Sequence, residues 1–293
     1  MKKLIFKGAA TAIVTPMNSD RTINYDKLEE LTENQISKGI DALVVCGTTG
    51  ESATVNDEEQ RKIIKTVVNK AAGRVPIIAG AGSNNTAHAL VLSQNAADVG
   101  ADALLLVTPY YNKASQSGLI EHYTHIADRT SLPIILYNVP SRTGVNIKPK
   151  TYKELSKHPN IVAVKEANGD VAALCESISL CQDDLAFYSG NDDCIVPFLS
   201  LGCKGVISVA SNILPYEIHK ICYDYINGNI KDAVYAQTKY IALFKALFCD
   251  VNPIPIKEAM NILDMNVGPT RLPLSQISDD LRDYLKKELS KIL

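Results

Sequence analysis

The chain has 293 residues, of which 46% are hydrophobic and 21% are charged, and this composition excludes disordered and fibrous proteins. Its 30 Lys and Arg and 32 Asp and Glu give a formal net charge of -2, without the positive excess of a typical nucleic-acid-binding protein. No apolar run is long enough for a signal-peptide core or a membrane span, so we expect a cytoplasmic protein with small-molecule or protein partners. The 7 cysteines include no C-x-x-C pair, which indicates reduced thiols rather than disulfides or a zinc site.

Eight short apolar runs follow one another through the first two-thirds of the chain. They cover residues 9–14, 42–46, 75–79, 103–107, 133–137, 161–164, 185–188 and 205–209. The segments between them read as amphipathic helices, such as one that begins at Asn56 or Asp57 and ends before Gly73. This alternation predicts an α/β fold of the (β/α)₈ TIM barrel type, although a doubly wound sheet with extra strands would give a similar pattern.

The last part of the chain contains three more helical segments, at residues 215–227, 230–248 and 254–263. We therefore predict a catalytic barrel over residues 1–224 and a C-terminal helical appendage over residues 225–293. One buried stripe is expected in the middle helix, formed by Val234, Tyr240, Ile241, Phe244 and Leu247.

Polar and reactive side chains follow almost every predicted strand. In a barrel the carboxyl ends of all strands meet on one face, where active sites of this fold are built, so this pattern favours the barrel over the open sheet. The residues that gather there by this argument are Thr48, Thr49, Tyr110, Tyr111, Tyr137, Arg142, Lys165 and Gly190.

Lys165 follows the apolar residues 161–164, so a buried strand carries an amine at its own C-terminal tip. A buried ammonium is unfavourable unless it is paired, so this lysine is either satisfied by a partner or kept partly neutral as a nucleophile. The alternative is a strand-end lysine that reaches solvent with Glu166 as its surface partner. The reactive residues after the other strands favour a Schiff-base lysine.

A lysine that forms an imine needs a proton relay to expel the carbinolamine hydroxyl, and Tyr137 with Thr48 or Thr49 can form one. Arg142 lies five residues beyond Tyr137, and a guanidinium is the usual group for holding a carboxylate. These residues together predict a keto-acid substrate.

Several segments of the chain resemble the dihydrodipicolinate synthase family, within the N-acetylneuraminate lyase superfamily of class I pyruvate aldolases. They are residues 47–52 (GTTGES), 108–112 (TPYYN), 137–144 (YNVPSRTG), 164–166 (VKE), 252–257 (NPIPIK) and 271–273 (RLP). The resemblance spans nearly the whole chain. It implies a lyase that condenses pyruvate with L-aspartate 4-semialdehyde to give 4-hydroxy-tetrahydrodipicolinate, in the biosynthesis of diaminopimelate and lysine.

The same resemblance implies the roles of the catalytic residues. Lys165 carries the pyruvate imine, and Tyr137, Thr48 and Tyr111 relay protons, with Tyr111 donated by the neighbouring subunit. No metal and no organic cofactor is implied, because the imine itself is the electron sink. The expected assembly is a homotetramer built from tight dimers.

Substrate binding is also implied by the resemblance. Thr49 and the backbone of Gly190 and Ile207 hold the pyruvate end, and Arg142 binds the carboxylate of the semialdehyde.

Feedback inhibition by lysine is a property of some members of the family. Their lysine site uses positions that match Ser52, Ala53, Asn84, His88 and Tyr110 here. The family glutamate is replaced by His88, so a carboxylate that would neutralise the bound ammonium is lost, and we expect weak or no inhibition. Asp57 is the first candidate for a substitute charge.

Two other functions remain open. Sugar-acid aldolases and lyases of the same superfamily share the lysine and the tyrosine, but the lyase typically carries Ser-Thr in place of Thr48-Thr49 and lacks Arg142. A non-catalytic barrel that binds an organic acid would use Lys165 only structurally.

Two cofactor-dependent alternatives are disfavoured. A pyridoxal-phosphate enzyme needs a phosphate cradle, and Asp192 and Asp193 would repel its phosphate. A zinc site at His122 and His125 lacks a nearby third ligand.

Overall fold

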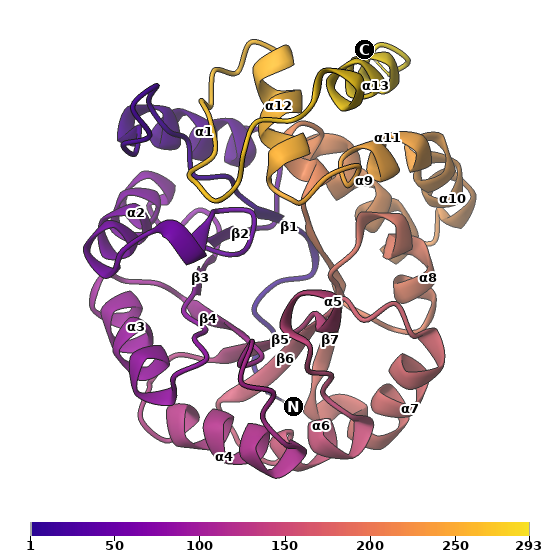
Figure 1. Ribbon diagram of the computed structural model, residues 1–293. Coiled ribbons are helices and arrows are strands. Elements are labelled where there is room, and N and C mark those ends of the chain that lie inside the picture. The colour runs from indigo at the N-terminus through magenta and orange to yellow at the C-terminus, as the bar shows by residue number, and fades with distance from the viewer. Residues whose placement is uncertain (1, 293) are drawn as a thin grey trace.

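The eight predicted strands form a closed parallel barrel. The computed structural model describes residues 2–292, and the strands follow one another around the barrel in chain order (Figure 1). They are β1 (Gly8–Ala12), β2 (Ala42–Val45), β3 (Ile77–Gly80), β4 (Ala103–Val107), β5 (Ile134–Asn138), β6 (Ile161–Glu166), β7 (Ala186–Ser189) and β8 (Gly205–Ser208). The predicted (β/α)₈ barrel is confirmed, and the open-sheet alternative is wrong.

Helices form a ring around the strands in Figure 1, and further C-terminal helices lie over one edge of it. The α-helices are α1 (Tyr25–Ser37), α2 (Asp57–Ala71), α3 (Thr86–Asp98), α4 (Gln116–Ala127), α5 (Pro140–Thr143), α6 (Pro149–Leu155), α7 (Val171–Cys181), α8 (Ile195–Ser200), α9 (Pro215–Ile226), α10 (Ile230–Lys239), α11 (Ile241–Ala246), α12 (Ile254–Ile262) and α13 (Asp279–Leu289). Short 3₁₀ turns occur at η1 (Ser52–Thr54), η2 (Gln182–Asp184), η3 (Asp192–Cys194) and η4 (Ala210–Asn212). No helix within residues 2–292 combines the length and the apolar character needed to cross a membrane.

Helix α2 illustrates how local sequence sets these elements. Asn56 caps its first turn by accepting from the backbone N–H of Glu59, and the Glu59 side chain accepts from the backbone of Asn56 in return. Ala72 ends the helix in a left-handed conformation, with Gly73 after it. The bounds predicted for this helix are therefore confirmed.

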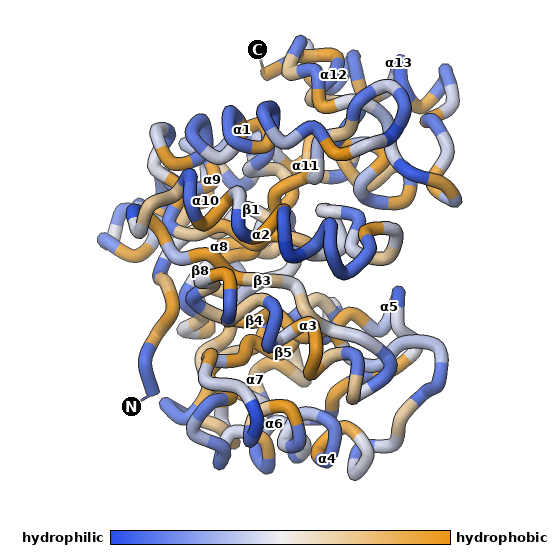
Figure 2. The backbone as a smooth tube through the Cα atoms, turned by 90° about the vertical axis from the view of Figure 1, so that its left-hand side faces the viewer, coloured by the Kyte–Doolittle hydropathy of each residue, from blue (hydrophilic) through white to orange (hydrophobic). Residues whose placement is uncertain are grey.

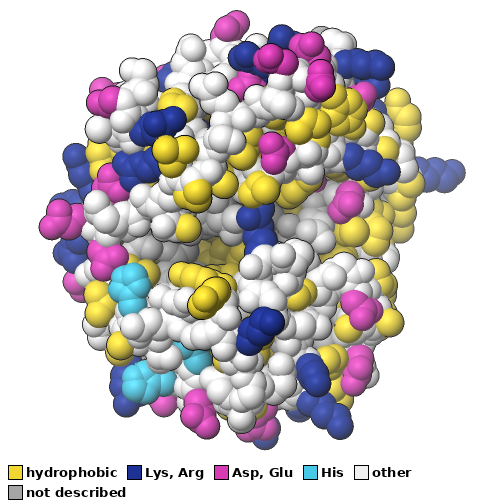
Figure 3. All heavy atoms as spheres, in the orientation of Figure 1, with side chains coloured by type: hydrophobic (Ala, Val, Ile, Leu, Met, Phe, Trp, Pro, Cys, Tyr) yellow, Lys and Arg dark blue, Asp and Glu magenta, His cyan; other side chains and the backbone are white. Residues whose placement is uncertain are grey.

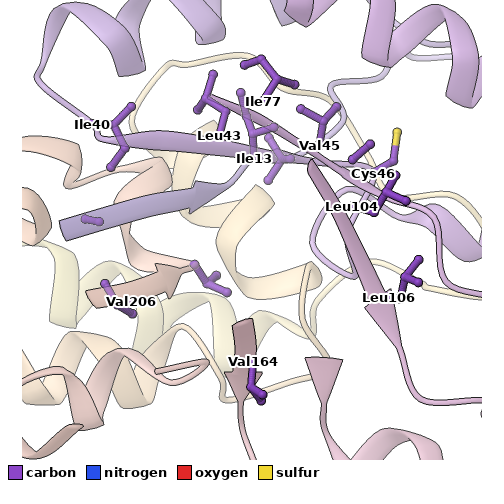
Figure 4. Close-up of a cluster of buried hydrophobic side chains, with 14 of the residues drawn as sticks. Ile13, Ile40, Leu43, Val45, Cys46, Ile77, Leu104, Leu106, Val164 and Val206 are labelled. Atoms are coloured by element: carbon purple, nitrogen blue, oxygen red, sulfur yellow. The ribbon is translucent and has the colours of Figure 1, made fainter. Parts of the chain in front are cut away.

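The core has two layers, as expected when side chains alternate between the two faces of each strand. One layer fills the space between the strands and the helices, where Leu43, Leu104 and Val164 lie (Figure 4). The other fills the barrel interior and includes Tyr137 and Ala163. In β6, Ala163 therefore faces inward and Val164 outward, and the same alternation turns the next side chain, that of Lys165, toward the interior.

The N-terminal segment closes the end of the barrel that lies opposite α5 (Figure 2). The ring of Phe6 stacks on that of Tyr188 with 4.2 Å between centroids, and the Tyr188 hydroxyl donates to the Phe6 carbonyl at 2.6 Å. The reactive end of the barrel is therefore the opposite one.

The C-terminal region differs from the prediction in two respects. Residues 230–248 form two helices, α10 and α11, because the backbone at Tyr240 leaves the helical conformation; α10 packs on α9, and α11 packs on α13. Val234 is 42% exposed and lies outside the expected stripe, whereas Tyr240, Phe244 and Leu247 are buried. The boundary expected between residues 224 and 225 falls in the last turn of α9 and stays a prediction.

Candidate active site

Lys165 and Tyr137 lie next to each other at the carboxyl ends of β6 and β5. They are register partners on neighbouring strands, and the Lys165 Nζ lies 4.4 Å from the centroid of the Tyr137 ring. Lys165 is 5% exposed, and within residues 2–292 its amine makes no ion pair with a carboxylate. Glu166 is buried on the outer face of the barrel, so the alternative of a surface pair between the two is wrong.

Thr48 and Thr49 follow β2 in the loop formed by residues 47–52. Thr48 lines one cavity with Tyr137 and an adjoining cavity with Arg142. Figure 3, in the same view as Figure 1, shows this face hollowed near its centre, with basic side chains beside the hollow. The structure therefore brings Thr48, Tyr137 and Arg142 to one depression at the end of the barrel.

Gly190 follows β7 beside Lys165, and Ile207 lies in β8. A Cβ atom at Gly190 would lie 2.7 Å from the Cβ of Ala167 and 3.3 Å from the Cε of Lys165, so glycine allows β7 to approach the lysine closely. Ile207 is fully buried in the barrel interior.

Asp192 fixes the chain just beyond β8. It is buried, and it accepts from the backbone N–H groups of Val209 and Ala210 at 3.1 and 2.9 Å. Burial raises the pKa of Asp192, while hydrogen bonds from Ser208 and these amides oppose the shift. Its carboxyl group therefore orders the turn after the strand that carries Ile207.

Asn252 links two of the candidate binding residues, and sequence reasoning gave it no role. Its side-chain amide donates to the Thr49 hydroxyl at 3.0 Å, and its backbone carbonyl accepts from the Arg142 guanidinium at 3.2 Å. The only available signal was its place in the segment 252–257, because no local pattern pairs residues so distant in the chain.

A buried ion pair holds the loop of residues 47–52 against the C-terminal helices. The Lys257 Nζ lies 2.8 Å from a Glu51 carboxylate oxygen and also donates to the carbonyls of Thr15 and Pro269. The other Glu51 oxygen accepts from the backbone N–H of Arg271 at 2.8 Å. Burial lowers the pKa of Lys257, and the charge of Glu51 opposes that shift.

Tyr111 is the one predicted catalytic residue that does not join the others within a single chain. Its side chain is 90% exposed, and its backbone is left-handed with φ of 74°. Tyr110, beside it, lines both cavities. The Tyr111 side chain lines neither cavity of its own chain, and its expected role in the relay of a neighbouring subunit stays a prediction.

The residues that match the family lysine site surround one of the cavities. Ser52, Ala53, His88 and Tyr110 line it, and the Asn84 carbonyl accepts from the Asn112 side chain nearby. The His88 Nε2 lies 3.0 Å from a carboxylate oxygen of Asp57. A carboxylate is thus present in this cavity, but it is engaged by the histidine.

His122, considered above as a zinc ligand, is buried, and its Nδ1 lies 2.8 Å from the Thr86 hydroxyl. Burial lowers the pKa of His122 to about 4. No cluster of three or more His, Cys, Asp or Glu side chains suited to a metal ion occurs in the described part of the chain.

A (β/α)₈ barrel with a buried lysine at the tip of its sixth strand and a tyrosine beside it defines the class of lysine-dependent aldolases and lyases. The model of the dihydrodipicolinate synthetase family matches residues 5–292. The chain belongs to this family, and the resemblance inferred from the sequence is confirmed.

Similar proteins carry consistent names. The chain is 53% identical over 288 residues to the 4-hydroxy-tetrahydrodipicolinate synthase of Thermoanaerobacter pseudethanolicus, covering 98% of this chain and 97% of that protein. It is 51% identical to the 4-hydroxy-tetrahydrodipicolinate synthase of Acetivibrio thermocellus, and the match covers 99% of this chain and 98% of that protein. The solved structure of dihydrodipicolinate synthase from Thermotoga maritima is 40% identical in sequence and superimposes with a TM-score of 0.96. The match covers 98% of this chain and 99% of that chain.

The ion pair between Lys257 and Glu51 gives a first prediction. Lys257→Ala leaves the Glu51 carboxylate buried without its cation, so the free energy of unfolding should fall by about 3–5 kcal/mol. Lys286→Ala is the matched control, because its ammonium forms an exposed pair with Asp283 on α13 and should change stability by less than about 0.5 kcal/mol. Urea denaturation of both variants measures this, and equal small losses would contradict the anchoring role.

Proposed function

We propose that this protein condenses pyruvate with L-aspartate 4-semialdehyde to give 4-hydroxy-tetrahydrodipicolinate, the first committed step of diaminopimelate and lysine biosynthesis. The observation that carries the proposal is the buried Lys165 amine, placed 4.4 Å from the Tyr137 ring and, within residues 2–292, in no ion pair with a carboxylate. The names of full-length relatives at 53% and 51% identity support the same reaction.

The chemistry begins with attack of the Lys165 amine on the keto carbon of pyruvate. The carbinolamine loses its hydroxyl as water when Tyr137, in a relay with Thr48 in the same cavity, delivers a proton, which leaves the iminium and a Tyr137 phenolate. The phenolate removes a proton from the pyruvate methyl group to give an enamine, whose carbon attacks the aldehyde of the second substrate. The amino group of that substrate then attacks the imine carbon, which closes the ring and releases the Lys165 amine. The imine serves as the electron sink, so we propose that neither a metal nor an organic cofactor takes part.

The proposed binding of the two substrates uses residues on the same face of the barrel. Thr49 and the backbone at Gly190 and Ile207 hold the pyruvate end, close to the lysine. Arg142 binds the carboxylate of the semialdehyde, because it lies in the adjoining cavity and the Asn252 carbonyl orients its guanidinium. A solved relative from Acinetobacter baumannii, 42% identical, is described as complexed with pyruvate.

The proposed assembly is a cytoplasmic homotetramer, a dimer of dimers in which Tyr111 completes the relay of the neighbouring subunit. The support is that the Tyr111 side chain is 90% exposed next to Tyr110, which lines both cavities, so it is accessible to a neighbouring subunit. One solved relative is described as a monomeric variant, so the assembly needs a direct measurement by sedimentation.

The imine gives the second prediction. Borohydride reduction in the presence of pyruvate should attach a pyruvyl group to Lys165, and peptide mass mapping should find it there. Lys257 is the internal control, because its amine is equally buried but bound to Glu51. Adduct formation without condensation would favour a sugar-acid aldolase, and absence of the adduct would favour the binding protein.

Arg142 gives the third prediction. Arg142→Ala should lower kcat/KM for the semialdehyde by roughly 30-fold or more, because a hydrogen bond to a charged group contributes about 2 kcal/mol. The rate of imine formation with pyruvate should stay close to that of the unchanged enzyme. Single-turnover trapping and the condensation assay separate the two steps, and equal losses in both would contradict the assigned role.

Lysine inhibition gives the fourth prediction. Because His88 stands at the glutamate position and holds the Asp57 carboxylate, lysine should inhibit weakly or not at all. Initial rates over a range of lysine concentrations measure this. If strong inhibition is found, its loss in Asp57→Asn would identify Asp57 as the substitute charge.

A further inference from the structure

The residues directly after Tyr137 and Lys165 form a second pair on the outer face of the barrel. Asn138 and Glu166 are register partners in β5 and β6, one position beyond the catalytic pair. Because side chains alternate along a strand, they point away from the interior that Tyr137 and Lys165 face. Asn138 is 0% exposed and Glu166 is 2% exposed.

Glu166 is surrounded by hydrogen-bond donors. The Asn138 side-chain amide lies 2.9 and 3.2 Å from its two carboxylate oxygens, the Tyr152 hydroxyl donates at 2.7 Å, and the Asn168 backbone N–H donates at 3.0 Å. Each of these groups satisfies an ionised carboxylate. The carboxylate therefore joins the tips of two strands to helix α6.

Asn138 is fixed from its other side. Its side-chain oxygen accepts from the Ile147 backbone N–H at 3.1 Å, and its amide donates to the Asn146 side chain at 2.7 Å. The amide can therefore present only its N–H groups to Glu166.

Backbone hydrogen bonds extend the link toward the pyruvate-binding residues. Ala167 N–H donates to the Asn138 carbonyl at 2.9 Å, and Gly190 N–H donates to the Glu166 carbonyl at 2.8 Å. A shift of the β6 tip would therefore move Lys165 relative to both Tyr137 and Gly190.

We propose that Asn138 and Glu166 are positioning residues for imine formation: they bind the tips of β5 and β6 together behind Tyr137 and Lys165 and so fix the amine against the phenol. This inference rests on the proposed function. A displacement of about 1 Å at reacting groups can lower a rate by about 100-fold, so such a clamp is kinetically important.

Glu166 is also the group of this cluster that titrates near neutral pH. Burial raises the pKa of Glu166 to about 7, and its hydrogen-bond donors oppose the shift. The titratable neighbours are the Tyr152 phenol on α6 and the Cys203 thiol before β8, and burial holds the pKa of each far above neutrality. Protonation of Glu166 removes its charge and adds a hydroxyl facing groups that donate to it in this arrangement, so it weakens the clamp as the pH falls through about 7.

The test measures the rate of imine formation with pyruvate by single-turnover borohydride trapping. Glu166→Gln and Asn138→Ala should each lower the maximal rate by about tenfold or more, with the pyruvate concentration at half-maximal rate nearly unchanged. The double variant should be no slower than the slower single variant, since both changes break one link. Losses that multiply in the double variant would overturn the proposal.

The pH profile separates positioning from general stability. In the unchanged enzyme the rate should fall as the pH drops below about 7. Glu166→Gln should not show this fall in rate at low pH, called the acid limb of the pH profile. Tyr152→Phe should move it to higher pH, because it removes a donor that favours the ionised form.

Tyr123→Phe is the matched control, because Tyr123 is a buried tyrosine of α4 whose hydroxyl donates to the Leu106 carbonyl and not to Glu166. This variant should keep both the rate of imine formation and the acid limb of the unchanged enzyme. An acid limb that persists unchanged in Glu166→Gln would overturn this inference alone. An unchanged enzyme that forms no pyruvate imine would overturn the proposed function, and this inference with it.

Discussion

The register between β5 and β6 is the constraint on which the site depends. Parallel pairing places Tyr137 beside Lys165, and the alternation of side chains turns both into the barrel while Asn138 and Glu166 turn outward. A slip of one residue in β6 that turned Glu166 inward would put a carboxylate where the amine belongs, and the equivalent slip in β5 would put the Asn138 amide in place of the Tyr137 phenol. Closure of the barrel prevents such a slip, because every strand is hydrogen-bonded on both sides.

The C-terminal helices contribute to the site as well as covering one edge of the barrel. Asn252 connects Thr49 with Arg142, and Lys257 holds Glu51 by a buried ion pair. Two proposed substrate-binding residues, Thr49 and Arg142, are therefore hydrogen-bonded to one residue just before α12. These contacts connect the C-terminal segment directly to the loops that follow β2 and β5.

Much of this architecture could be predicted from the sequence because the informative patterns are local. Apolar runs marked all eight strands, and the strand ends marked Lys165, Tyr137 and Arg142. The missing parts depend on contacts between distant residues. Helix α13 was missed because its sequence is dominated by charged residues and only a few leucines face the core. The break at Tyr240 was missed because packing on α9 and α13, rather than a helix-breaking residue, divides α10 from α11. The burial of Glu166 could not be read from its sequence either, since its partners Tyr152 and Asn138 lie 14 and 28 residues away.

The long reach of the loop contacts also bears on how the protein is made. Thr49 and Asn252 are 203 residues apart in the chain, and Glu51 and Lys257 are 206 apart. During synthesis the loop of residues 47–52 leaves the ribosome long before its partners exist, so a nascent barrel holds this loop without its final hydrogen bonds. Contacts of such large sequence separation form late and slowly. Catalytic competence therefore comes at the end of translation, after the segment around α12 has emerged and docked.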